Sequence, residues 1–328
     1  MNLYPLTFHP ILKQKVWGGR ALERFGKQLP ANVSIGESWE LTDLPPSVDQ
    51  GKSIISNGPL AGLTLSEAIE QSPSIMGSTP LVSGGFPLLI KFLDANDNLS
   101  VQVHPDEAYV ASHPEAHLKS EAWIILDAAP KGCIYVGLAQ GTTEADLRTA
   151  MKNDSVSELL RAIEVRKGEC YYLPSGTCHA LGAGVLVAEV QTPSDTTFRL
   201  WDWGRTGRTM HVEQAMQCID FHARDLHCAQ PDALKSGPFL TTHYIDTPFF
   251  SIERIEATED ATLPMIVDDA PAVLMVVEGH ANIEHEQPID ATTGTTVLLP
   301  AGLSNAIMHM PKGTAVLRFD LPPRKVIA

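Results

Sequence analysis

Residues 168–179 follow the spacing G-x5-P-x-G-x2-H, which restricts the local fold to a strand, a tight turn and a second strand. Proline cannot donate a hydrogen bond to a sheet, and glycine adopts turn conformations freely. We therefore expect the first strand to end at Pro174 and the second to begin at His179, with its imidazole directed inward. Residues 294–305 repeat this spacing, and Asn305 stands where the histidine would be. The repeat predicts two related β-units, of which only the first has a histidine at this position.

The rest of the chain indicates a mainly β protein. Short runs rich in strand-forming residues, such as 86–93, 122–126 and 185–190, are separated by glycine, proline, asparagine and aspartate. This pattern is typical of a sandwich or a barrel. Helices are expected to be few, namely around residues 64–69, 106–112 and 143–151, and after Ser155, which has capping-box spacing to Glu158.

The length of 328 residues favours two domains. Turn-forming and polar residues interrupt the pattern of strands between 230 and 238, so we place the domains at residues 1–236 and 237–328. The strand expected at 272–280 has no Q-x-H or H-x-H pair. The second domain is therefore predicted to be a barrel without metal.

The charge of the chain limits its partners. A formal net charge of -15 and a pI near 5.2 give no basic surface for nucleic acid or for an anionic membrane. The first residues lack the basic and apolar segments of a secretion signal. No apolar run approaches the ~18 residues that a membrane span requires, so a cytoplasmic location is expected. The five cysteines have an odd count and no C-x-x-C spacing, which favours reduced thiols over disulfides.

Four side chains form a candidate metal site. Within residues 100–105, the alternation of a strand places Gln102 and His104 on one face. Glu121, on a neighbouring strand, and His179 are expected to converge on them. Imidazole, carboxylate and amide oxygen suit zinc or another first-row divalent ion, and the absence of thiolate ligands argues against a closed structural site. An open coordination position would then be available for a substrate.

Seven segments, taken together and in order, resemble one protein family. They are W-G-G at 17–19, G-E-S-W-E at 36–40, P-L-L-I-K at 87–91, L-S-V-Q-V-H-P-D at 99–106, K-S-E-A-W at 119–123, P-S-G-T-C-H-A at 174–180 and E-V-Q-T-P-S-D-T-T-F-R at 189–199. The G-x5-P-x-G-x2-H element alone is similar to the second motif of the cupin superfamily. The ordered set resembles the type I mannose-6-phosphate isomerases of the short bacterial class. The resemblance extends over nearly the whole chain.

This resemblance implies a mainly β fold of two tandem cupin-type jelly-roll barrels, with a few short helices inserted in the first barrel, which alone would carry metal. It also implies a zinc-dependent interconversion of mannose 6-phosphate and fructose 6-phosphate, with one Zn2+ per chain. Carried over by position, the metal ligands would be Gln102, His104, Glu121 and His179. The family's active-site arginine corresponds to Arg199, and a lysine two residues before the glutamate ligand corresponds to Lys119. Some relatives of the short class have lysine where this chain has Gln102, which leaves the ligand count at this position open.

The chemistry of such an isomerase suggests further roles. A carbonyl moves between C1 and C2 when a proton is taken from one carbon and returned to the other through an enediolate, whose charge a divalent metal and Arg199 could stabilise. Either Lys119 or Glu189 could be the base. The side chains expected to bind the phosphate at one barrel mouth are Ser100, Lys91, Lys119 and Arg199. Trp17 and Glu37 are expected to line the entrance.

Simpler roles compete with these predictions. The two histidines could be hydrogen-bonded core residues, Arg199 could pair with Asp195 or Asp202, and Lys91 could reach solvent along its aliphatic stem. At the level of function, the chain could be a non-catalytic sugar-binding or regulatory cupin, or another metal-dependent cupin enzyme such as an iron-dependent dioxygenase. The expected partner is a small-molecule sugar phosphate, and either a monomer or a homodimer is compatible with the sequence.

Overall fold

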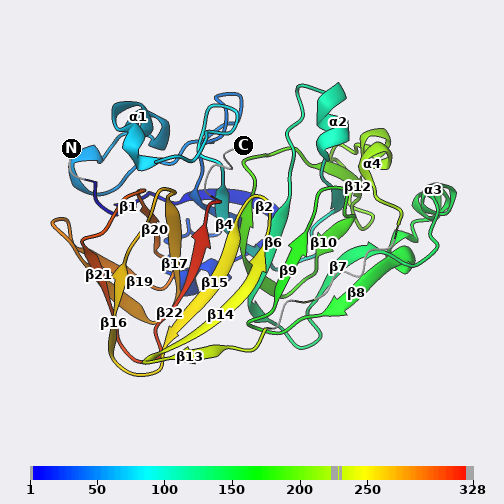
Figure 1. Cartoon of the computed structure of the whole chain (residues 1–328). Helices are drawn as coiled ribbons and strands as arrows, with labels where there is room; N and C mark the ends of the chain where they lie inside the picture. Colours follow the sequence, from blue (N-terminus) through cyan, green and yellow to red (C-terminus); the bar gives the residue numbers. More distant parts are fainter. Residues whose placement is uncertain (1–2, 223–227, 229–230, 323–328) are drawn as a thin grey trace.

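The computed structural model of the chain describes residues 3–222, 228 and 231–322, and it is built mainly from β-strands (Figure 1). Its strands form four sheets, which pair as two jelly-roll barrels side by side. The predicted fold class is therefore confirmed. Among the described residues, no helix combines the length and the apolar character that a membrane crossing requires.

The first barrel consists of a six-stranded and a five-stranded sheet. The six-stranded sheet has the order β2 (Ile11–Gly19), β3 (Ile35–Leu41), β4 (Leu89–Ala95), β11 (Val185–Gln191), β6 (Glu121–Ala128) and β9 (Cys170–Leu173). The five-stranded sheet has the order β12 (Phe198–Trp201), β5 (Val101–Val103), β10 (His179–Leu181), β7 (Cys133–Leu138) and β8 (Leu160–Glu164). As predicted, β9 ends before Pro174, the following turn contains Gly176 with φ 83°, and β10 begins at His179.

The second barrel consists of a seven-stranded and a four-stranded sheet. The seven-stranded sheet has the order β1 (Leu6–Thr7), β20 (Thr296–Leu299), β17 (Ala272–Glu278), β22 (Ala315–Asp320), β15 (Ser251–Ala257), β14 (Phe239–Asp246) and β13 (Leu234–Ser236). The four-stranded sheet has the order β16 (Ala261–Met265), β21 (Ala306–Met310), β18 (His280–Glu284) and β19 (Ile289–Thr292). The repeated spacing forms the same unit here, because Gly302, with φ 75°, lies in the turn between β20 and β21. The domain boundary between residues 236 and 237 stays a prediction.

A single apolar core joins the two barrels. Ile90 and Phe92 of β4 belong to the same buried cluster as Leu317 and Phe319 of β22, so the six-stranded sheet packs on the seven-stranded sheet. Because side chains alternate along a strand, the residues between them point the other way, and Leu93 belongs to the core of the first barrel. Every residue of β4 is buried as a result.

Short helices cover the outer face of the five-stranded sheet. Side chains of α2 (Glu107–Ser112), α3 (Glu144–Lys152) and α4 (Val212–Cys218) pack there, on the right of Figure 1, whereas α1 (Leu65–Gln71) packs against the core shared by the barrels. Capping boxes begin α1 and α3, from Thr64 to Glu67 and from Thr143 to Asp146. The 3-10 turns are Ala21–Phe25, Gly58–Leu60, Pro73–Ile75 and Val156–Leu159.

The helix predicted after Ser155 is wrong. Residues Val156–Leu159 form only a short 3-10 turn, and the Ser155 side chain makes no capping hydrogen bond. The chain enters β8 at Leu160 and pairs there with β7, so sheet pairing competes successfully with the local capping signal. Helix α4, in contrast, was not predicted from the sequence.

Replacing Phe319 by alanine tests whether the shared core stabilises the protein. Its ring is fully buried between the two sheets, so Phe319→Ala should lower the free energy of unfolding by ~3–5 kcal/mol in denaturant titrations. The matched control is Ile307→Ala on the four-stranded sheet, because this side chain is 41% exposed, and its cost should stay below about 1 kcal/mol. Equal losses in the two variants would contradict the shared core.

Candidate active site

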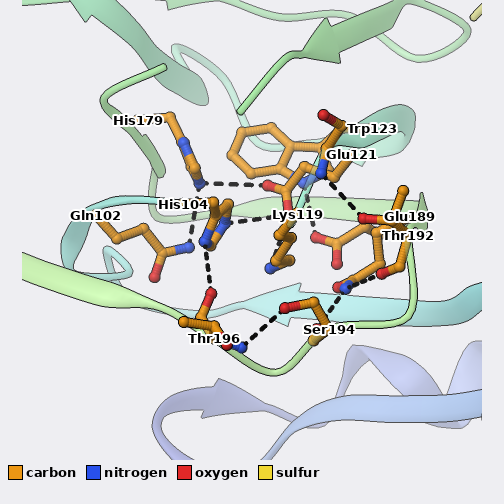
Figure 2. Close-up of polar contacts among 12 residues, drawn as sticks. Gln102, His104, Lys119, Glu121, Trp123, His179, Glu189, Thr192, Ser194 and Thr196 are labelled. Carbon is orange, nitrogen blue, oxygen red and sulfur yellow. Dashed lines mark hydrogen bonds and ion pairs between the residues drawn. The ribbon is translucent and has the colours of Figure 1, made fainter. Parts of the chain in front are cut away.

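Three buried side chains meet inside the first barrel (Figure 2). His104 follows β5, Glu121 begins β6 and His179 begins β10. One ligand atom from each lies within 4.8 Å of the others. Each carboxylate oxygen of Glu121 is 3.3 Å from an imidazole, one from Nε2 of His104 and the other from Nε2 of His179. The structure therefore brings together three of the four predicted ligands in a compact cluster.

Backbone carbonyls fix the tautomers of the two histidines. Nδ1 of His104 donates to the carbonyl of Thr196 at 3.1 Å, and Nδ1 of His179 donates to that of Thr177 at 2.8 Å. In a neutral imidazole, donation from Nδ1 leaves a lone pair on Nε2. Burial and the nearby charge of Lys119 lower the pKa of His104 to about 3, so this ring is neutral at neutral pH. Both lone pairs therefore face the carboxylate.

This arrangement fits a divalent metal ion. Burial alone would raise the pKa of Glu121, but the neighbouring charge of Lys119 holds that pKa well below its ordinary value. Nε2 of His104 and Oε1 of Glu121 are buried and have no hydrogen-bond partner among the described residues, and Oε2 of Glu121 is contacted by the Lys119 ammonium at 2.8 Å. Acceptors that face one another without a donor between them are costly, and a metal cation satisfies all of them. His104 is thus not a satisfied core residue, which argues against the competing interpretation at this position.

The fourth predicted ligand, Gln102, lies at the edge of this cluster. Its amide nitrogen is 3.2 Å from Nε2 of His179, on the strand that pairs with β10. A half-turn of the amide group brings its oxygen to the same place, so Gln102 can supply an oxygen ligand. Lys119 approaches from the other side, with Nζ 2.8 Å from Glu121.

A cavity of about 240 Å³ lies beside the candidate metal ligands. Its walls contain every residue predicted for catalysis or substrate binding, namely Trp17, Glu37, Lys91, Ser100, Lys119, Glu189 and Arg199, together with Gln102. Lys15, Asp195 and Arg208 also line it. The structure brings these side chains to one place, and their individual roles stay predictions.

Buried ion pairs form a ladder along one wall of the cavity. Lys15 lies 2.9 Å from Glu37, and Lys91 lies 3.7 Å from Glu37 and 2.9 Å from Glu189. Trp39 and Trp123 donate their indole hydrogens to Glu37 and Glu189, at 2.6 and 2.8 Å. Burial opposes these charges. The ion pairs outweigh it, lowering the pKa of Glu37 to about 2 and raising the pKa of Lys91. Lys91 is only 6% exposed and does not reach solvent.

Arg199 lies on β12, where it pairs in register with Gln102 of β5. Its Nε donates to the Ser100 hydroxyl at 3.2 Å, and its Nη1 donates to the carbonyl of Thr209 at 2.6 Å. Among the described residues it makes no ion pair, so the alternatives that it pairs with Asp195 or Asp202 are wrong. Burial, and the nearby charge of Arg208, lower the pKa of Arg199, but a guanidinium stays charged at neutral pH.

Two cavity cations were missed in the sequence. Lys15 shares a strand face with Trp17, and this alternation was a usable signal. Arg208 lies in the segment after β12, where no periodic pattern indicates which side chains point inward.

The chain has two jelly-roll barrels, and the first contains a buried cluster of two histidines and a carboxylate. These features define a metal-binding protein of the two-barrel cupin class. The family model for the catalytic domain of type I phosphomannose isomerase matches residues 6–133. Over 312 residues the chain is 35% identical to mannose-6-phosphate isomerase ManA of Bacillus subtilis, covering 92% of this chain and 95% of that protein. This chain therefore belongs to the type I phosphomannose isomerase family.

Solved structures agree with this assignment. The crystal structure of the mannose 6-phosphate isomerase from Bacillus subtilis superposes with a TM-score of 0.86 at 30% identity, covering 97% of this chain and 99% of that one. A zinc-bound mannose 6-phosphate isomerase superposes with a TM-score of 0.72 at 19% identity, covering 97% of this chain and 100% of that one. At 19% identity, the similarity to the second structure supports the assignment of the fold alone.

Removing a cluster residue should remove the metal. Glu121→Gln replaces the charged ligand by a neutral amide of the same shape, and His179→Ala deletes an imidazole, so each purified variant should retain only a small part of the metal bound by the wild type. Elemental analysis of the dialysed protein measures this. His309→Ala is the control, because His309 pairs with Glu284 in the second barrel and should leave the metal content unchanged. Full metal content in Glu121→Gln would exclude this cluster as the site.

Proposed function

We propose that this protein is a zinc-dependent mannose-6-phosphate isomerase, an aldose–ketose isomerase that interconverts mannose 6-phosphate and fructose 6-phosphate. The observation that supports this most directly is the cluster of buried imidazole and carboxylate acceptors beside the cavity that contains Arg199. The relatives that carry this activity in their names match the chain over nearly its full length.

The proposed metal is zinc, held by His104, Glu121, His179 and the amide oxygen of Gln102. Two imidazoles and oxygen ligands without thiolate suit a catalytic zinc site, and a solved relative of the same fold is described as zinc-bound. When bound, the ion supplies Lewis-acid polarisation of the substrate carbonyl. The chain's part is to hold the ligands in place, through the carbonyls of Thr196 and Thr177.

The reaction needs a base that serves both C1 and C2. In the open-chain aldose the base takes the proton from C2 and returns it to C1, while the proton of the C2 hydroxyl passes to the C1 oxygen, which leaves the carbonyl at C2. Lys119 is our first candidate, acting as the neutral amine, since its Nζ lies beside the metal ligands and the residue lines the cavity. Glu189 is the second, since its Oε1 lies 2.9 Å from Lys91 and its carboxylate also lines the cavity.

Arg199 is proposed to stabilise the negative charge of the enediolate. A guanidinium is planar and permanently charged, and that of Arg199 is held by Ser100 and the Thr209 carbonyl without a neutralising carboxylate among the described residues. A fixed cation of this kind needs little reorganisation when charge develops in the transition state.

The remaining wall residues are proposed to bind the sugar phosphate. Ser100 offers a hydroxyl, Lys91 offers an ammonium shared with two carboxylates, and Trp17 and Glu37 form part of the wall near Lys15. The cytoplasmic location, and the choice between monomer and homodimer, stay predictions from the sequence.

An isomerase assay with and without chelator tests the proposed function. Metal-loaded protein should convert fructose 6-phosphate into mannose 6-phosphate, followed by a coupled enzymatic assay. Prolonged chelation should abolish turnover, because the cluster of His104, Glu121 and His179 would lose its cation, and added Zn2+ should restore it. A metal-loaded protein without turnover would favour a sugar-binding cupin, and turnover that survives complete metal removal would refute the role of the metal.

Substitution of Arg199 tests the proposed charge stabilisation. Arg199→Ala should lower kcat by about 100- to 1,000-fold, the typical cost of removing one stabilising donor, while the bound metal is unchanged. Steady-state kinetics and elemental analysis of the same preparation measure both. The control Arg24→Ala removes an exposed arginine paired with Asp127 and should leave kcat at the wild-type value. Near-normal turnover of Arg199→Ala would refute the assignment.

A further inference from the structure

A buried carboxylate, Asp202, binds two arginines at once just beyond β12. Nη1 of Arg208 lies 2.9 and 3.0 Å from its two oxygens, and Nη2 and Nε of Arg205 lie 2.8 and 3.2 Å from Oδ1. Asp202 is only 3% exposed. We call these three residues the Asp202 cluster.

The two arginines of this cluster have different surroundings. Arg208 lines the cavity beside the metal site. Arg205 turns away from it, to the Asn98 carbonyl at 2.6 Å and the exposed carboxylate of Asp97 at 3.2 Å. Only Nη1 of Arg208 is bound within the described residues, so its Nε and Nη2 groups are left to donate to a ligand.

The turn that builds the cluster is fixed by an unusual backbone. Trp203 has φ 56°, a left-handed conformation that bulky residues rarely adopt, and Gly204 follows with φ 74°. The indole of Trp203 donates to the Leu99 carbonyl at 2.6 Å and packs on Trp201. Because Leu99 precedes Ser100, this contact ties the turn to the segment just before β5, where the Ser100 hydroxyl accepts from Arg199.

The cations that line the cavity differ in how far neighbouring carboxylates compensate their charge. Lys15 and Lys91 are paired with the carboxylates of Glu37 and Glu189, and Lys119 is paired with Glu121. Among the described residues Arg199 has no ion pair, and Arg208 shares the carboxylate of Asp202 with Arg205, which is also paired with Asp97. The remaining wall carboxylate, Asp195, is exposed and screened by solvent.

We propose that Asp202 is a positioning residue that holds Arg208 at the cavity wall, and that Arg208 binds the phosphate dianion of the sugar substrate. This inference rests on the proposed function. With Nη1 occupied by Asp202, the Nε–H and Nη2–H edge of Arg208 forms the planar donor fork that suits two phosphate oxygens. The carboxylate fixes the orientation of that fork before the substrate arrives, which reduces the entropy lost on binding.

Steady-state kinetics of variants at these positions test the inference. In Arg208→Ala, KM for mannose 6-phosphate should rise by about 10- to 100-fold, the loss expected for hydrogen bonds to a charged group, while kcat stays within about threefold. Asp202→Asn, which keeps the size of the side chain but loses its charge, should raise KM in the same direction by a smaller factor. Arg208→Lys should restore part of the lost affinity.

Arg205→Ala is the matched control, because Arg205 binds the same carboxylate but does not line the cavity. Its KM should stay within about twofold of the wild type, since it makes no substrate contact. Equal increases in KM for Arg205→Ala and Arg208→Ala would overturn the inference, since the cluster would then act only on the fold. Unchanged KM with lowered kcat in Arg208→Ala would overturn it as well. Thermal unfolding of each variant verifies that it is folded.

Binding of inorganic phosphate separates this inference from the proposed function. In calorimetric titrations of the metal-loaded protein, Arg208→Ala should bind inorganic phosphate at least tenfold more weakly than the wild type does, by about the factor expected for KM. This measurement needs no turnover. Equal phosphate affinity in the two proteins would overturn the role of Arg208, whereas a wild type that binds phosphate through Arg208 without turnover would refute only the isomerase proposal.

Discussion

The site depends on a carboxylate that is buried opposite two imidazole lone pairs. Thr196 and Thr177 accept the Nδ1 hydrogens of His104 and His179, so neither ring can donate to Glu121 through Nε2. Three acceptors facing one another in a desolvated interior are unfavourable unless a cation lies among them, and the Lys119 ammonium contacts only Oε2 of Glu121. The barrel maintains this arrangement because β5, β6 and β10 carry the ligands at or next to their ends. Metal binding and the local fold are therefore coupled.

The second barrel contributes to the site although its described residues supply no ligand. On β4, Ile90 and Phe92 pack into the core shared by the barrels, so Lys91 between them is directed into the first barrel. With both faces of the strand covered, the Lys91 ammonium is desolvated and its pairing with Glu37 and Glu189 becomes strong. If the outer face of β4 were exposed to solvent, water would weaken the ion pairs of Lys91. The apolar interface between the barrels thus strengthens the ion pairs of Lys91 with Glu37 and Glu189.

The sequence is most informative where spacing and local geometry coincide. The turn at Gly176 and the inward imidazole of His179 follow from glycine and proline positions, and alternation places Gln102 beside His104 in the same manner. Prediction failed after Ser155, where pairing with β7 overrides a capping signal. It also missed Arg208, whose direction depends on a left-handed turn at Trp203 that no local rule anticipates. Contacts between segments distant in sequence, such as Leu6 with Leu298, are equally invisible to local patterns.

The distribution of charge explains how a chain with a net charge of -15 can accept an anionic substrate. Surface charges more than about 10 Å away are screened at moderate salt, so the cavity wall dominates the local potential. Along the ladder, Lys15 and Lys91 are compensated by Glu37 and Glu189, so that wall suits hydroxyl groups rather than a dianion. Arg199 has no ion pair among the described residues, and Arg208 shares the carboxylate of Asp202 with Arg205. With Arg208 as the proposed phosphate site, the phosphate of the substrate would lie toward Arg208 and its carbonyl end toward the metal ligands. A neutral sugar makes no ion pair with Arg199 or Arg208, so this distribution of charge would select against it.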